Sequence, residues 1–133
     1  MQFGKPIGRN QALQQNLALV AGDTAAATMA ARVALADADG PSARFSAAVA
    51  KVRAGEAATR ATGIAHQVHG AIGFTQEHAL HFATRRLWAW RAQFGSDAWW
   101  AAELGRSAIA AGGSGFWTAL TQRRFDTLDI NPT

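Results

Sequence analysis

The stretch LALVAGDTAAATMAARVALADADGPSARFSAAVAKV, residues 17–52, decides the fold, because it holds one helix, a stop and the start of a second helix. Apolar residues in and before its first half recur at steps close to three and four, the spacing of one helix face. This stripe consists of Leu13, Leu17, Val20, Ala27, Ala31 and Leu35. Asp39-Gly40-Pro41 then breaks the pattern, since glycine permits left-handed geometry and proline cannot continue a helix. The sequence therefore predicts a first helix from about Asn10 to Asp37.

Three more helices are predicted after this stop. They run from about Ser42 to His69, from Gln76 to Arg91 and from Asp97 to Ala111. Each has a residue that can cap its first turn, namely Ser42, Thr75, and Ser96 or Asp97. The glycine-rich run 112–115 is expected to end the last of these helices, and a short helix is expected around Trp117–Phe125.

The length and composition favour a single helical domain. The 133 residues fit one domain, and alanine dominates the apolar fraction. Alanine is the best helix former because it loses no side-chain entropy on folding. No stretch alternates β-branched residues with period two, so strands are not expected. We predict an all-α fold, with an antiparallel four-helix bundle over residues 1–115 and a C-terminal tail over residues 116–133.

The composition also excludes several classes of protein. The chain has no cysteine, which excludes disulfides and thiol chemistry. It has no uninterrupted run of about 18 apolar residues, and Met1–Asn10 does not have the pattern of a signal peptide. We therefore expect a cytoplasmic protein without a membrane partner.

A net charge of +4 hints at an anionic partner. The arginines are spread along the whole chain, however, whereas nucleic-acid binders usually concentrate them on one face. Four tryptophans near Arg85-Arg86 could stack on nucleobases, but such a group is more often core or subunit interface. Solvated helix faces are the simpler interpretation, and no nucleic-acid partner is expected.

Two segments with small residues could bring a ligand close to the backbone. Residues 2–7, Gln-Phe-Gly-Lys-Pro-Ile, lead into the first helix, and residues 67–75, Gln-Val-His-Gly-Ala-Ile-Gly-Phe-Thr, interrupt the helical pattern. Small residues permit close approach, and free N–H groups at a helix start can receive anions. Each segment alone is also explained by ordinary structure, as a hydrophobic staple and as a helix C-cap with a turn.

Catalytic groups and metal ligands are sparse. Four histidines, His66, His69, His78 and His81, form two i, i+3 pairs that could bind zinc or copper. No carboxylate completes a metal signature, so helix capping or an interface is the simpler role, and no metal site is predicted. The serines lack a recognisable base nearby, and no phosphate-binding loop occurs. No catalytic residue is assigned.

Taken together, three ordered segments resemble the C-terminal domain of acyl-CoA dehydrogenases, from near the first helix to the chain end. Residues 2–7 with Gln11 resemble the family's Arg-x-x-Phe-Gly-…-Gln signature, and residues 67–75 resemble its Gln-…-Gly-Gly-x-Gly-Phe/Tyr-Thr turn. Glu77-His78-Ala79-Leu80-His81 with Arg85-Arg86 is similar to a bacterial branch of the family. The resemblance implies a helical domain that accompanies a β-barrel and another helical domain, in dimers or tetramers.

By this resemblance, six positions are expected to contact FAD. Two match the Phe-Gly segment and the glutamine after it: Phe3 and Gln11. Four match the turn that contacts the FAD of a neighbouring subunit: Gln67, His69, Gly70 and Ala71. Ala71 replaces the family's second glycine.

Two departures from the family pattern concern chemistry. The family's arginine for the flavin pyrophosphate would lie at or before Met1. Its catalytic glutamate belongs to a Tyr-Glu-Gly-Thr segment that falls on Gln93-Phe94-Gly95-Ser96, so Phe94 takes the place of the glutamate. Phenylalanine cannot abstract a proton, and nothing in the pattern makes Glu77 the base.

In the family reaction, a carboxylate abstracts an α-proton while a hydride passes to FAD. The resemblance thus implies a C-terminal domain or fragment of an FAD-dependent acyl-CoA dehydrogenase, an oxidoreductase acting on CH–CH groups. It would contribute FAD contacts and subunit packing within a homo-oligomer or with a partner subunit, bind acyl-CoA only with further domains, and be inactive alone. The alternative is a non-catalytic helical assembly module that pairs with itself or with a larger flavoprotein subunit.

Overall fold

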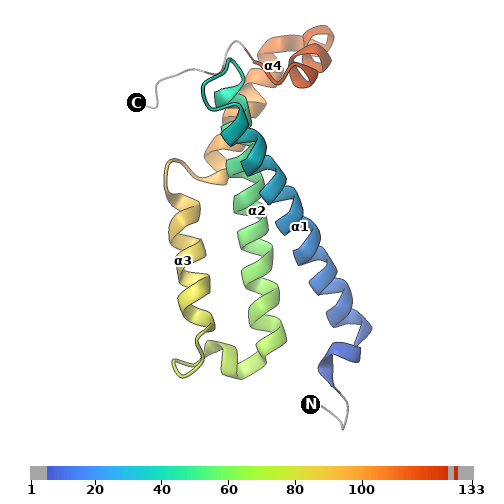
Figure 1. Cartoon of the computed structure of the whole chain (residues 1–133), viewed down its shortest axis with the longest axis vertical. Helices are drawn as coiled ribbons and strands as arrows, with labels where there is room; N and C mark the ends of the chain where they lie inside the picture. Colours follow the sequence, from blue (N-terminus) through green and yellow to red (C-terminus); the bar gives the residue numbers. More distant parts are fainter. Residues whose placement is uncertain (1–5, 126–127, 129–133) are drawn as a thin grey trace.

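The computed structural model describes residues 6–125 and residue 128, and within these residues it contains helices and no strand (Figure 1). After a short 3-10 helix η1 (Ile7–Arg9), the elements are α1 (Gln11–Ala36), α2 (Ala43–His69), the 3-10 helix η2 (Gly70–Phe74), α3 (Leu80–Ala92) and α4 (Asp97–Thr121). The predicted all-α fold is confirmed, and the bounds of α1 and α2 agree closely with the predicted ones.

Helix α2 is the central element of the domain. Helices α1, α3 and α4 each pack against it. Helices α1 and α2 form a long antiparallel pair, and α3 returns beside the second half of α2. Helix α4 begins near the middle of α2 and continues in the same direction as α3 (Figure 1). Since α2 is the shared partner, much of the outer surface of α1, α3 and α4 faces solvent.

The contact between α1 and α2 is fixed by a buried carboxylate. Asp23 of α1 lies with one oxygen 3.3 Å from an Arg53 guanidinium nitrogen and the other 2.9 Å from an Arg60 nitrogen, both arginines belonging to α2. The second contact is an ion pair without hydrogen-bond geometry. A buried charge is costly unless it is paired. The two arginines therefore set the register of α1 on α2.

A small apolar core lies where α2 begins. Phe45 packs against Phe125, with ring centroids 5.5 Å apart, and against Leu128. Val49 and Leu104 extend this cluster along α2 and α4. The C-terminal segment thus contributes to the core of the domain.

Helix α3 begins at Leu80, later than the predicted start at Gln76. The chain first makes the 3-10 turn η2 and then a further turn, so Thr75 does not cap the helix. The backbone N–H of Leu80 instead donates to the His78 imidazole Nδ1, at 3.1 Å. The sequence prediction was wrong here because a histidine two residues before the helix start supplies the acceptor that a hydroxyl usually gives.

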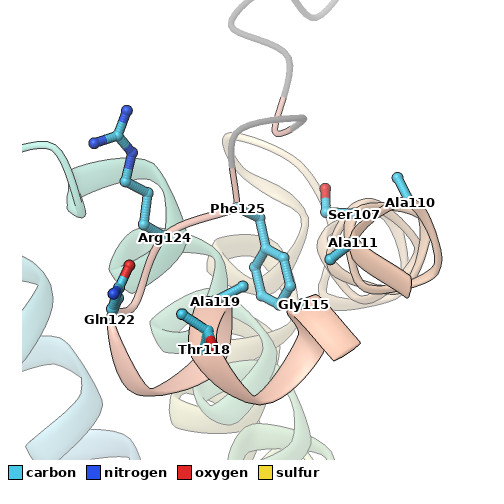
Figure 2. A pocket seen from close by; sticks show the side chains of 9 residues that line it. All are labelled: Ser107, Ala110, Ala111, Gly115, Thr118, Ala119, Gln122, Arg124 and Phe125. Atoms are coloured by element: carbon cyan, nitrogen blue, oxygen red, sulfur yellow. The ribbon is translucent and has the colours of Figure 1, made fainter. Parts of the chain in front are cut away.

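The glycine run that was expected to end the last helix interrupts it at Gly112, within α4. Gly112 has φ 65° and ψ 170°, and the helix kinks there and resumes to Thr121. A cavity of about 600 Å³ opens at the kink, lined by Ser107 and Ala111 on one side and Gly115 and Thr118 on the other. Figure 2 shows the ring of Phe125 among these residues. The predicted division at residue 115 stays a prediction, and α4 runs across that point.

Helix α1 is long and apolar enough, by length and composition alone, to cross a membrane, with a mean hydropathy of 1.2. A search for uninterrupted apolar runs misses α1, because its polar residues are scattered. Its many alanines and leucines nevertheless keep the mean hydropathy of the helix high. In the structure, α1 packs on α2 through the ion-paired Asp23.

Candidate functional site

The turn at the end of α2, residues 67–74, is an open surface with an unusual backbone. Gln67, His69, Gly70 and Ala71 are all exposed. Gly70 has φ 64° and ψ −148°, a conformation open essentially only to glycine. A Cβ atom built on Gly70 would meet nothing within 4 Å. A ligand could therefore come close to the backbone of this turn.

Histidine and aromatic contacts hold the turn against α3. The His66 ring stacks on Phe74 with centroids 4.7 Å apart, and its Nε2 lies 3.2 Å from the hydroxyl of Thr84 in α3. His69 and His78 contact each other edge to face, with centroids also 4.7 Å apart. Contacts with residues of both α2 and α3 thus set the position of the turn.

The predicted flavin-contacting residues fall into three groups. Gln67, His69, Gly70 and Ala71 lie together on the exposed turn. Gln11 is the first residue of α1 and is also exposed, at the same end of the molecule as the turn (Figure 1). Phe3 lies outside the described residues. Their contact with FAD stays a prediction.

The four histidines lie near the turn, two in the last turn of α2 and two around the start of α3. Over residues 6–125 and 128, no group of three or more histidine, aspartate or glutamate side chains could hold a metal ion. His69 and His81 each use Nδ1 to bond a backbone carbonyl, those of Ala65 and His78. His69 is the last residue of α2 and His81 lies in the first turn of α3, so both bonds are made at helix ends.

A second feature is the loop Gln93–Ser96 between α3 and α4, here called the Phe94 loop, whose side-chain contacts the sequence did not reveal. The Lys51 ammonium of α2 donates to the carbonyl of Gln93 at 2.6 Å. The indole Nε1 of Trp100 donates to the carbonyl of Phe94 at 2.9 Å. Ser96 caps α4 as predicted, accepting the N–H of Trp99 at 3.1 Å. These bonds hold Phe94 at φ 57°, which is uncommon for a residue with a side chain.

A bidentate ion pair closes the same loop. Arg91 at the end of α3 donates through Nε and a terminal nitrogen to the two oxygens of Asp97, each at 3.0 Å. The hydrogen bond from Arg91 lowers the pKa of the Asp97 carboxyl, against the opposing effect of burial. Asp97 sits directly over Gly55 of α2, where a Cβ atom would lie 2.4 Å from the Asp97 Cβ. The absence of a side chain at Gly55 thus lets α4 approach α2 at this point.

The Phe94 side chain is the most exposed large apolar group at this loop, at 90%. It lies at the rim of a cavity with Arg44, Trp99 and Trp100. No carboxylate of the described chain lines this cavity. The loop therefore presents an aromatic ring and holds no group that could act as a general base.

Comparison with known proteins places the sequence in a family. The family described as acyl-CoA dehydrogenase, C-terminal domain, matches residues 1–112. The chain belongs to this family. The helical fold of such a C-terminal domain agrees with the all-α architecture seen here.

Curated relatives of this acyl-CoA dehydrogenase domain share more than a third of the aligned residues. The acyl-CoA dehydrogenase IpdE2 of Mycobacterium tuberculosis is 38% identical over 86 residues, covering 65% of this chain and 26% of that protein. The 3-sulfinopropanoyl-CoA desulfinase of Paraburkholderia xenovorans is 39% identical over 84 residues, covering 63% and 22%. The chain thus spans about a quarter of the length of these relatives. No solved structure matches the chain.

Proposed function

We propose that this domain serves an FAD-dependent acyl-CoA dehydrogenase-type oxidoreductase by contributing flavin contacts and subunit packing, without supplying the catalytic base. The observation that supports this most directly is the exposed turn 67–74 within a domain of this family. Acyl-CoA would bind only where further domains complete the pocket. We also propose that the enzyme is cytoplasmic, as in bacteria, because α1 packs on α2 through Asp23 and does not serve as a membrane span.

The turn has the properties that a flavin contact needs. The surface above Gly70 is open, so a flat ring can approach the backbone. Ile72 and Phe74 leave most of their side chains exposed beside it, which offers apolar surface for packing. The Gln67 amide can both donate and accept hydrogen bonds, which suits the polar edge of a flavin or its ribityl chain. The small side chain of Ala71 leaves room for the ring beside the Gly70 backbone.

When bound, FAD supplies the hydride-accepting chemistry. The residues of this chain would orient the cofactor through Gln67 and the Gly70 backbone. Gln11 would contribute from the start of α1. Because the turn is fixed by His66 against Thr84 of α3, its backbone would meet the cofactor with little reorganisation.

The catalytic base is proposed to come from elsewhere in the assembly. Phe94 occupies the place that the family pattern gives to a glutamate, and its ring points into solvent at the rim of a cavity without carboxylates. The paired Asp97 is held by Arg91 and is a poor proton acceptor, because its pKa is lowered. The chain alone is expected to show no acyl-CoA dehydrogenation.

Subunit packing is supported by exposed apolar side chains on three helices. They include Leu17, Leu19 and Met29 on α1, Phe82 and Trp90 on α3, and Ile109 and Trp117 on α4. Soluble monomers rarely leave large contiguous apolar patches uncovered. We propose that partner subunits or further domains cover them. A purely structural assembly module remains the competing function, and it would form colourless oligomers.

A matched pair of substitutions tests the flavin contact. Ala71→Leu adds bulk on the exposed turn, whereas Ala102→Leu makes the same change at an exposed position of α4. FAD is titrated against each protein by calorimetry and by thermal unfolding, because a ligand of the folded state raises the unfolding temperature. We expect Ala71→Leu to weaken FAD binding about tenfold or more, the size of about 1.4 kcal/mol, and Ala102→Leu to leave it unchanged. Equal FAD binding by both variants, or no binding by the parent chain, would reject the flavin contact.

A further inference from the structure

The cavity beside the Phe94 loop is an aromatic pocket with one cation at its wall. It encloses about 630 Å³ and is lined by Arg44, Phe94, Gly95, Ser96, Trp99 and Trp100. This volume falls in the range of small-molecule sites, which are mostly apolar with a few polar groups. Its lining residues belong to the start of α2, the α3–α4 connection and the first turn of α4, whereas the turn 67–74 follows the opposite end of α2.

Among residues 6–125 and 128, Arg44 has no carboxylate partner, unlike the other arginines near helix contacts. Arg53, Arg60, Arg91 and Arg123 each pair with an aspartate. The Arg44 guanidinium instead lies over the Trp100 ring, 5.5 Å from its centroid, and its buried Nε has no hydrogen-bond partner. Arg44 also sits in the first turn of α2, the positive end of the helix. A buried donor without an acceptor is costly, so this site favours an anion.

The pocket is built before any ligand arrives. The Trp100 indole is tied to the Phe94 carbonyl, and the Trp99 and Trp100 rings contact each other edge to face with centroids 4.7 Å apart. Lys51 and the Arg91–Asp97 pair hold the two ends of the loop. Binding would therefore immobilise few side chains, which lowers the entropy cost of association.

We propose that this pocket binds a small organic anion, a carboxylate carried on an aromatic or aliphatic body. The carboxylate would accept hydrogen bonds from the Arg44 guanidinium, and the body would pack between Phe94 and the two tryptophans. This site would serve binding and no covalent step. It does not depend on the flavin contact, because none of its lining residues belongs to the turn 67–74.

The probe is 2-naphthoate, with the uncharged 2-naphthalenemethanol as its isosteric partner, both titrated by calorimetry. The variant is Arg44→Gln, and the matched control is Arg86→Gln. Arg86 lies over Trp90 of the same helix with its guanidinium 5.7 Å from the ring centroid, but outside the pocket. Circular dichroism and the unfolding temperature establish that each variant is folded.

We expect Arg44→Gln to weaken 2-naphthoate binding about tenfold or more, the usual size of a lost charge-assisted hydrogen bond, and Arg86→Gln to change it less than about twofold. Added salt should weaken 2-naphthoate binding by the parent chain and leave the alcohol unaffected. Equal affinity for the two probes, or equal loss in both variants, would overturn the proposal. Should Arg44→Gln fail to fold, a salt-independent affinity for 2-naphthoate by the parent chain would overturn it alone.

Discussion

At the scale of single residues, Gly55 controls how closely α4 approaches α2. Alanine would raise the helix propensity of α2 by about 1 kcal/mol, but its methyl group would collide with the Cβ of Asp97 at 2.4 Å. Overpacking of this kind typically costs about 1–3 kcal/mol. Gly63 lies in the same helix with nothing within 4 Å of its Cβ position, so it is the matched control.

We expect Gly55→Ala to lower the free energy of unfolding by about 1–2 kcal/mol and Gly63→Ala to raise it by up to about 1 kcal/mol, measured by urea denaturation. The two changes have opposite sign only if Asp97 packs on Gly55. Equal stabilisation by both alanines would show that α4 does not lie against α2 at this point.

The Arg91–Asp97 pair should make stability depend on pH in a defined direction. The folded pKa of Asp97 is lowered, so its contribution is fully present above the unfolded value near 3.8 and is lost as the pH falls through the lower folded value. We expect Asp97→Asn to cost about 1–3 kcal/mol at pH 7 and to converge on the parent chain as the pH falls below the lowered folded pKa of Asp97.

Glu103→Gln is the control for this change, because Glu103 pairs with the exposed Arg106 within one helix. Such surface pairs contribute about 0–1 kcal/mol, so the loss at pH 7 should be small. Urea denaturation at several pH values measures both variants. A loss for Asp97→Asn that stays constant from pH 7 to below the lowered folded pKa of Asp97 would show that the carboxylate charge does not stabilise the loop.

At the scale of elements, helix starts and stops were predictable where one residue decides them. Asn10 and Ser96 accept backbone N–H groups at the starts of α1 and α4, as residues of their type usually do. Ser42 precedes α2 without such a bond. The late start of α3 was not predictable, because it depends on where the His78 imidazole lies after the turn.

Glycine at the kink of α4 gives the clearest test at this scale. Gly112 has φ 65° and ψ 170°, whereas Gly113 is inside the resumed helix with open space at its Cβ position. We expect Gly112→Ala to cost about 1–3 kcal/mol, because an alanine strains this backbone, and Gly113→Ala to be neutral or stabilising. Thermal and urea unfolding of the two variants measure this. A stabilised Gly112→Ala would mean that the helix runs straight through this position.

At the scale of the whole molecule, the sequence predicted the helical class and the family but could not show how the helices meet. The spacing of hydrophobic residues marks one face of each helix, but polar and small residues set the packing here. Asp23 of α1 lies between two arginines of α2, and Gly55 lies under Asp97. Lys51 of α2 bonds the Gln93 carbonyl just after α3. The aromatic pocket beside the Phe94 loop could not be predicted from the sequence either, since Arg44 and Trp100 meet only after α2 and α4 pack.

The exposed turn, in contrast, followed from sequence, because Gly70 and the small residue after it interrupt a helical pattern. Their position on the surface is seen in the structure, and their contact with a flavin rests on the family. The turn and the uncovered apolar faces support the proposal that this domain works within an assembly.

Native mass spectrometry of the chain purified in the presence of FAD tests this central claim most directly. The account predicts particles of two or more 14.0 kDa chains that carry the mass of FAD. Single chains without flavin, observed at the same protein concentration, would contradict it.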